Sequence, residues 1–127
     1  MRTDRVQVPG AVEESPGRIP IDADTTSETI RRALRTGSGP IDLNEMAALA
    51  ETLQGHIALL LIEARETTSQ LGRGTLEAQQ TAARLKSIQE QFRRPLATRP
   101  LSAHAHVHQL ARDCQWLLAR HMVETRR

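Results

Sequence analysis

Three histidines, His104, His106 and His108, lie at alternate positions near the start of a predicted helix. In a helix, His104 and His108 share one face at a spacing of four residues, which is the spacing that two-histidine metal sites use. His106 points away from that face and Asp113 lies on another, so no third ligand stands beside the pair. We therefore interpret His104 and His108 as surface histidines and keep a metal site on them as the alternative.

Cys114 and His56 are residue types that can act as a nucleophile and its general base. Cys114, however, lies on the inward stripe of its predicted helix, where cysteine behaves as a small hydrophobic residue, and no third residue would orient the pair. His121 lies on the same stripe, where a histidine bonded to a carbonyl or an acid is the ordinary case. The chain also lacks the common nucleotide, hydrolase and zinc motifs, so we expect no catalysis and no cofactor.

Trp116 lies about 160° from the centre of the apolar stripe of its helix, at 3.6 residues per turn, and near Arg112 and Arg120. An exposed tryptophan flanked by arginines is typical of an interface anchor. The alternative is local cover of Trp116 by the N-terminal tail or by the first helix. We therefore predict Trp116, Arg112 and Arg120 as interaction residues.

Charge and composition limit the classes of partner. The 127 residues suffice for one domain, and 17 basic against 15 acidic side chains leave a net charge of +2. Residues 42–71 carry a net charge of −4 and residues 72–95 one of +3, which suits packing of one against the other more than binding of nucleic acid. The single cysteine fits a reducing cytoplasm. The longest apolar run, Ile57 to Ile62, is far shorter than the ~20 residues of a membrane span, so we expect no membrane contact.

Capping signals and apolar spacing predict an all-α fold. Residues 1–24 combine prolines and glycines with scattered apolar residues, so we expect a disordered or loosely docked tail. Residues 25–124 are predicted to form a small antiparallel bundle of one short helix and three long ones, because the connections are short. The predicted helices span 25–35, 42–71, 75–93 and 103–124, with Thr25, Asp42 and Ser102 as N-caps and Gly72 as a C-terminal cap.

The predicted helix over 42–71 is apolar on two opposite faces. One face is a heptad-like seam of residues spaced by four and three, namely Met46, Ala50, Leu53, Ile57, Leu60, Ala64, Thr67 and Leu71. The opposite face carries Ala48, Gly55, Leu59 and Ile62. Gly55 is unfavourable inside a helix, which predicts that another backbone approaches it closely. We expect this helix to be central in the fold, or its second face to meet another chain.

Three stretches of the chain carry a family resemblance: the run LQGHIALL over 53–60, the turn at Arg73-Gly74, and residues 110–112 leading to 117–121. Over 25–124 the sequence resembles an uncharacterised family of small helical bacterial proteins that are labelled as associated with natural-product biosynthesis. The resemblance implies a helical fold and that biosynthetic context. No catalytic residue is defined for the family, so the resemblance implies no site.

These observations favour a cytoplasmic helical bundle that acts as a non-catalytic accessory or interaction protein. The predicted interaction residues are Gly55, Leu59, Ile62, Arg112, Trp116 and Arg120, and the predicted partner is a second copy of the chain or another protein. The first alternative is a small enzyme or ligand carrier in a biosynthetic pathway, with a pocket lined by His56, Cys114 or His121. The second alternative is a nucleic-acid-binding regulator. It would use the arginines of the proline linker and of the C-terminus, namely Arg93, Arg94, Arg99, Arg126 and Arg127.

Overall fold

The chain folds into four α-helices, and the prediction of an all-α fold is confirmed. The computed structural model describes residues 21–36, 39–70, 72 and 74–125, and no strand occurs within those ranges. The helices are α1 (Ala23–Arg35), α2 (Leu43–Thr68), α3 (Leu76–Arg93) and α4 (Pro100–Thr125). The tail predicted over 1–24 lies outside the described residues up to position 20, and the helical part begins two residues before Thr25.

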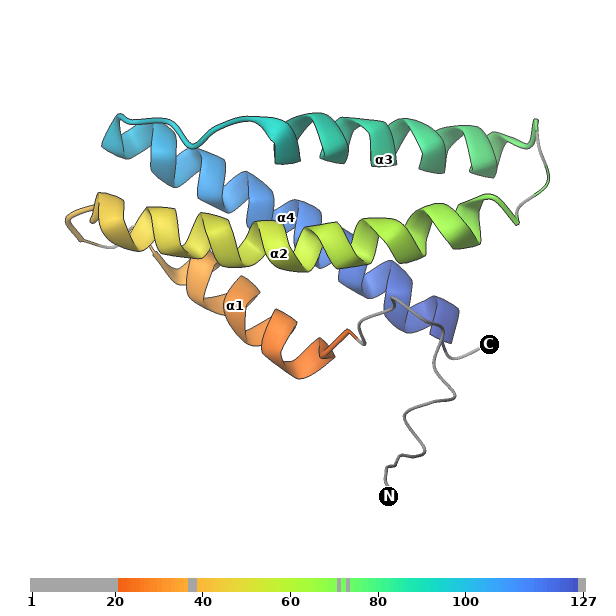
Figure 1. Cartoon of the computed structure of the whole chain (residues 1–127), viewed down its shortest axis with the longest axis horizontal. Coiled ribbons are helices and arrows are strands. Elements are labelled where there is room, and N and C mark those ends of the chain that lie inside the picture. The colour runs from red at the N-terminus through yellow and green to blue at the C-terminus, as the bar shows by residue number, and fades with distance from the viewer. Residues whose placement is uncertain (1–20, 37–38, 71, 73, 126–127) are drawn as a thin grey trace, which may run out of the picture.

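The helices are arranged around α2, which is flanked on three sides (Figure 1). α2 and α3 run side by side in opposite directions, as the short connection predicts. α4 crosses behind α2 at an oblique angle, and its most extensive contacts are with α2 and then with α1. α3 and α4 contact one another less closely than the other neighbouring pairs do, and an ion pair between Arg84 and Asp113 joins them at 3.7 Å.

The start of α1 differs from the prediction, because Asp22 and not Thr25 is the N-cap. The Asp22 carboxylate accepts from the Thr25 N–H at 3.1 Å and from the Thr25 hydroxyl at 2.8 Å. Glu28 does not complete a capping box but forms an ion pair with Arg31 at 2.7 Å. A carboxylate three residues upstream of Thr25 satisfies an N–H group of the first turn equally well, and it draws Thr25 into that turn.

The other helix ends follow the sequence signals with two exceptions. Asp42 caps α2 as predicted, because its carboxylate accepts from the N–H groups of Asn44 and Glu45. α2 ends at Thr68 with Ser69 as C-cap, and not at Gly72; position 71 lies outside the described residues. α4 begins at Pro100 and not after Ser102, since proline fits the first turn of a helix, where its missing N–H has no partner to lose.

The core confirms the seam of α2. Its members from Met46 to Ala64 are buried, Thr67 is half-buried, and Leu49 and Leu61 widen the buried face because α2 packs on more than one helix. The inward stripe of α4 is buried as well, with Val107, Leu110 and Cys114 at its centre. His121, predicted on the same stripe, is half-buried near the end of the helix.

The second apolar face of α2 is not covered by the rest of the described chain. Ile62 is 57% exposed, Ala48 and Gly55 are exposed, and Leu59 is half-buried. A Cβ atom placed on Gly55 would meet nothing within 4 Å, so the predicted close approach of another backbone from within the chain is wrong. The reason is geometric: α1, α3 and α4 occupy the other sides of α2 and leave this side, which faces the viewer in Figure 1, to the solvent.

Candidate functional site

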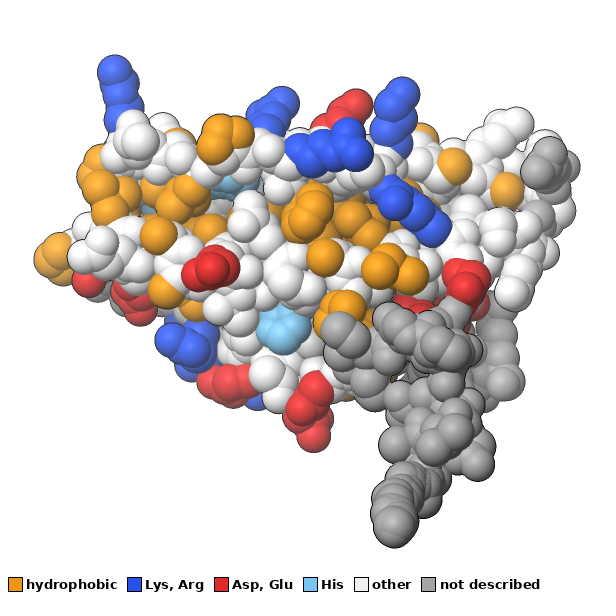
Figure 2. All heavy atoms as spheres, in the orientation of Figure 1, with side chains coloured by type: hydrophobic (Ala, Val, Ile, Leu, Met, Phe, Trp, Pro, Cys, Tyr) orange, Lys and Arg blue, Asp and Glu red, His pale blue; other side chains and the backbone are white. Residues whose placement is uncertain are grey.

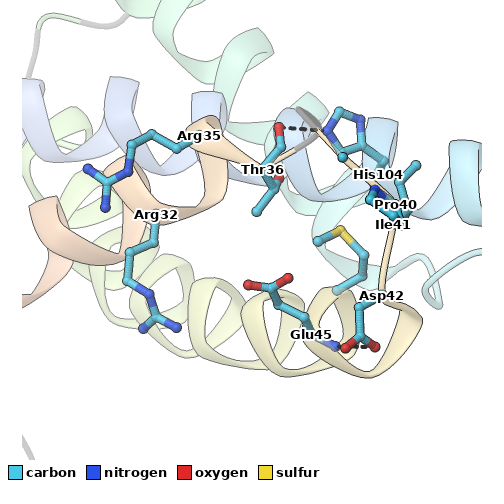
Figure 3. Close-up of a pocket in the computed structure, with 10 residues that line it drawn as sticks. Arg32, Arg35, Thr36, Pro40, Ile41, Asp42, Glu45 and His104 are labelled. Atoms are coloured by element: carbon cyan, nitrogen blue, oxygen red, sulfur yellow. Dashed lines mark hydrogen bonds between the residues drawn. The ribbon is translucent and has the colours of Figure 1, made fainter.

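His104 lies at the edge of a hollow of about 380 Å³ formed by the end of α1, the connection to α2 and the first turn of α2. Figure 3 shows Arg32 and Arg35 on one side of this hollow and the carboxylates of Asp42 and Glu45 on the other. The Asp42 carboxylate is already engaged as the cap of α2. The hollow is therefore polar, with opposite charges on its two sides.

His104 and His108 are brought together as the spacing predicts, with ring centroids 4.2 Å apart. His104 donates from Nε2 to the carbonyl oxygen of Thr36 at 3.0 Å. His108 Nε2 lies 3.5 Å from the Thr36 hydroxyl, which itself donates to Ala33, so this ring nitrogen also acts as a donor. Burial and the neighbouring His104 hold the pKa of His108 below its usual value.

A metal on this pair would have to use the remaining Nδ1 atoms or displace the bonds to Thr36. No group of three or more histidine, cysteine, aspartate and glutamate side chains suited to a metal occurs in the described part of the chain. His104 and His108 both contact Thr36, the C-cap of α1, and so connect the end of α1 to α4. The two rings thus fix the angle between those helices.

His56 bridges α2 and α1. Its Nδ1 lies 3.2 Å from the Thr26 hydroxyl and its Nε2 lies 3.3 Å from the Thr29 hydroxyl. Both hydroxyls also donate to backbone carbonyl oxygens, that of Asp22 at 2.8 Å and that of Thr25 at 3.1 Å. A neutral ring therefore satisfies the network only if one hydroxyl turns its hydrogen toward the imidazole. Burial lowers the pKa of His56, while Asp22 opposes that shift.

Cys114 is fully buried in the core and is not placed as a nucleophile. Burial, with the adjacent Asp113 carboxylate, raises the pKa of the thiol to about 12, so it is not ionised at neutral pH. Among the described residues no hydrogen bond joins Cys114 to His56. His121 lines a separate, smaller hollow of about 110 Å³ between the C-terminal halves of α2 and α4, which neither Cys114 nor His56 lines.

Trp116 is half-buried, and the arginine of α3 that covers it was not foreseen from the sequence. Arg84 places its guanidinium carbon 5.2 Å from the centre of the Trp116 ring, and Arg120 places its own at 5.9 Å. Arg112 is exposed, and among the described residues it is not one of the arginines that lie over the Trp116 ring. The local cover of Trp116 thus comes in part from α3 and from its own helix.

Asp113 is the residue that the sequence analysis placed on another face and did not single out. It is 3% exposed, accepts from Gln109 Nε2 at 3.0 Å on Oδ1, and has Arg84 Nη2 at 3.7 Å from the same oxygen. Burial raises the pKa of this carboxyl, and Gln109 and Arg84 reduce the shift. The signal in the sequence that could have identified Asp113 is an acidic residue at a heptad-like position beside the apolar stripe of α4.

Three buried side-chain atoms in the described residues have no hydrogen-bond partner: His106 Nε2, Asp113 Oδ2 and Arg120 Nε. They recur every seven residues and therefore lie in one line along the edge of α4 that contains the Arg84 contact. Buried polar atoms are ordinarily paired, so an unpaired row indicates water, an ion or another bound group. At one end, His106 and Gln109 line a further hollow of about 380 Å³ between α3, the proline linker and α4.

The outer face of α2 forms part of an apolar surface that extends toward α3. Figure 2 shows apolar side chains gathered along the groove between the two helices, with most basic side chains along α3 and acidic ones mostly along α2 and below it. Arg93, Arg94 and Arg99 are exposed around the linker, whereas Arg126 and Arg127 lie outside the described residues. By length and composition α2 is the one helix of the described residues that could cross a membrane, a test that the core helix of a soluble bundle also passes.

The chain belongs to a family of unknown function (DUF6415), whose model matches residues 24–126. No curated protein and no solved structure matches the chain. The membership agrees with the helical fold and with the extent of the resemblance noted in the sequence. It assigns no activity and no functional residue.

Proposed function

We propose that this protein is a non-catalytic interaction protein that pairs with a second copy of itself through the outer face of α2. The observation that carries the proposal is the uncovered apolar face: Ile62 is 57% exposed, Leu59 is half-buried, and Gly55, one turn before Leu59, opens onto empty space. A long helix that is apolar on both sides is ordinarily buried on both. In this chain the second side is left for a partner.

Charge complementarity favours a second copy as that partner. α2 carries four glutamates and one arginine, whereas α3, next to it, carries three basic and two acidic residues. A two-fold axis parallel to the helices and between them sets α2 of one copy against α3 of the other. That pairing brings an acidic helix against a basic one twice, and it generates a four-helix bundle.

The surface is also of adequate size. α2 has 26 residues and α3 has 18, which correspond to about 39 Å and about 27 Å of helix, each about 10 Å wide. The two faces together present roughly 650 Å² of flat area per copy, close to the ~800 Å² that each partner buries in a stable interface. Gly55, without a side chain, would let the backbones of the two copies come close at the centre.

The experiment is the measurement of molecular mass in solution by sedimentation velocity, from low to high micromolar concentration. We expect the native chain to shift from one copy to two as the concentration rises, and Ile62→Glu to remain a single copy. Val123→Glu is the matched control, because Val123 on α4 is similarly exposed, at 52%, and lies outside the proposed interface. A native chain that stays a single copy throughout would refute the proposal, as would equal loss of pairing in both variants.

Charge reversal tests the arrangement of the two copies. Glu51 on α2 and Arg93 on α3 are both exposed, and they lie at similar heights because Gln54, one turn after Glu51, reaches the carbonyl oxygen of Phe92. Glu51→Lys and Arg93→Glu should each weaken pairing by about two- to fivefold, since exposed ion pairs contribute up to about 1 kcal/mol. The two changes combined should restore pairing if α2 faces α3 of the other copy. A double variant that is weaker than either single variant would contradict that arrangement.

The setting of this role is part of the same proposal. We place the protein in the bacterial cytoplasm and in natural-product biosynthesis, as the family resemblance implies, and the buried thiol of Cys114 is compatible with a reducing compartment. Deletion of the gene, followed by metabolite profiling of the host, tests this placement. Loss of a secondary metabolite would support it, and an unchanged profile would count against it.

A further inference from the structure

The seam between α3 and α4 contains a buried carboxylate of which only one oxygen has a partner. Asp113 has its Oδ1 atom occupied by Gln109 at 3.0 Å and by Arg84 at 3.7 Å, while its Oδ2 atom is buried and has no partner. An ionised carboxylate accepts on both oxygens, so Oδ2 calls for a donor. The side chain itself is 4% exposed, so this donor has to enter the seam.

Arg84 is the cation that lies next to Asp113, and its contact with the carboxylate is weak. Its side chain is 44% exposed, its guanidinium contacts Asp113 through a single long ion pair of 3.7 Å, and its guanidinium carbon lies 5.2 Å from the centre of the Trp116 ring. A carboxylate beside an aromatic face is the combination that recognises organic cations. Bidentate pairing, which would use both carboxylate oxygens, is the stronger geometry for a guanidinium, and Arg84 does not reach it.

A second unpaired atom lies on the other side of the tryptophan. Arg120 has a buried Nε atom without a partner, its Nη2 atom lies 4.0 Å from Glu124, and its guanidinium carbon lies 5.9 Å from the Trp116 ring. The Nε–H group can only donate, so it requires an acceptor. Asp113 and Arg120 are seven residues apart, or about 10 Å along the helix.

We propose that Asp113, Trp116 and Arg120 form a binding site for a small organic cation that also carries an acceptor group, a place that Arg84 fills in the isolated chain. A guanidinium or an amine would pair with Asp113 across the tryptophan face, and a carboxylate or carbonyl of the same ligand would accept from Arg120. Arg84 would swing out to solvent, where more than two-fifths of it already lies. The site is on the α3–α4 seam and is independent of the proposed pairing through α2.

Arginine is the probe, because it carries a guanidinium and a carboxylate at its two ends. Citrulline is its matched control, because it has nearly the same shape with a neutral ureido group in place of the guanidinium. Its α-ammonium group lies one carbon from the carboxylate and cannot span the about 10 Å between Asp113 and Arg120. The chain has one tryptophan, so Trp116 fluorescence reports on the site directly. We expect arginine to change this fluorescence saturably, with an affinity about fivefold higher in Arg84→Ala than in the native chain, because the competing side chain is gone. Citrulline should give no saturable change.

Asp113→Asn should weaken arginine binding by about tenfold or more, since hydrogen bonds to a charged group contribute about 1.5–3 kcal/mol. Arg93→Ala, at an exposed arginine of α3, the helix that also carries Arg84, should bind arginine as the native chain does. Arg84→Gln repeats the test if the alanine variant fails to fold, as judged by circular dichroism. Equal responses to arginine and citrulline, unchanged binding in Asp113→Asn, or no saturable response in folded Arg84 variants would each overturn the proposal.

Discussion

Truncation of two apolar residues on opposite faces of α2 tests the arrangement on which the architecture depends. Leu53 has 0% of its surface exposed and lies at the centre of the seam, whereas Ile62 is 57% exposed on the outer face. Leu53→Ala removes a fully buried side chain and leaves a cavity, which costs about 2–5 kcal/mol. For a domain of this size the thermal midpoint should fall by roughly 8 °C or more.

Ile62→Ala should cost far less in the single copy. Full burial of an isoleucine contributes about 1.5–3 kcal/mol, and about two-fifths of Ile62 is covered, so the loss of burial is about 0.6–1.2 kcal/mol. Alanine regains a few tenths of a kcal/mol through its higher helix propensity, which leaves a net cost of roughly 0.5 kcal/mol. Urea unfolding at low micromolar protein, monitored by circular dichroism, measures both values. If Ile62→Ala costs as much as Leu53→Ala under those conditions, α2 is not oriented as described and the reasoning fails.

Three further predictions follow from single positions. Gly55→Ala should stabilise the single copy by about 0.5–1 kcal/mol, because the added methyl group meets nothing within 4 Å and alanine favours the helix; a lower thermal midpoint would show a hidden close contact. Cys114, buried and with a pKa of about 12, should react with iodoacetamide at neutral pH only as fast as the core opens, so labelling should accelerate in step with urea unfolding; rapid labelling of the native state would contradict its burial. Asp113 has a folded pKa above the usual 3.8, so its stabilising contribution is complete below that value and is lost as the pH rises through the folded pKa. Asp113→Asn should therefore gain stability relative to the native chain as the pH rises from about 3 to neutrality. A constant difference in the free energy of unfolding across that range would argue against the pKa shift.

Local signals accounted for most of the fold. The seam of α2 was predictable because spacings of four and three residues follow the helical period. The role of Asp42 as N-cap was predictable because a short carboxylate at that position satisfies N–H groups of the first turn of the helix. The same logic gave the wrong cap for α1, where Asp22 and Thr25 both offer oxygen acceptors and only the backbone path selects between them. Capping competition of this kind is decided by torsion angles that the residue types do not fix.

The candidate sites were harder to predict from the sequence, because they depend on contacts between helices. The pairing of His104 with His108 follows from helical spacing, but their common attachment to Thr36 joins residues some seventy positions apart. Two further contacts could be predicted only if the relative placement of α3 and α4 were known. They are the packing of Arg84 over Trp116 and the contact of Arg84 with one oxygen of Asp113. A periodicity argument places a residue on a face, but it does not say which helix lies opposite.

The sequence alone thus determined that the chain is helical, where α2 and α3 lie along it, and that α2 has two apolar faces, because these depend on interactions within one or two turns. The tertiary structure decided which of those two faces the chain itself buries. Three helices of limited width, packed at the angles that their side chains allow, enclose the seam and flank the helix without closing over Gly55 and Ile62. That choice is a property of the packing of all four helices together, and no single segment encodes it.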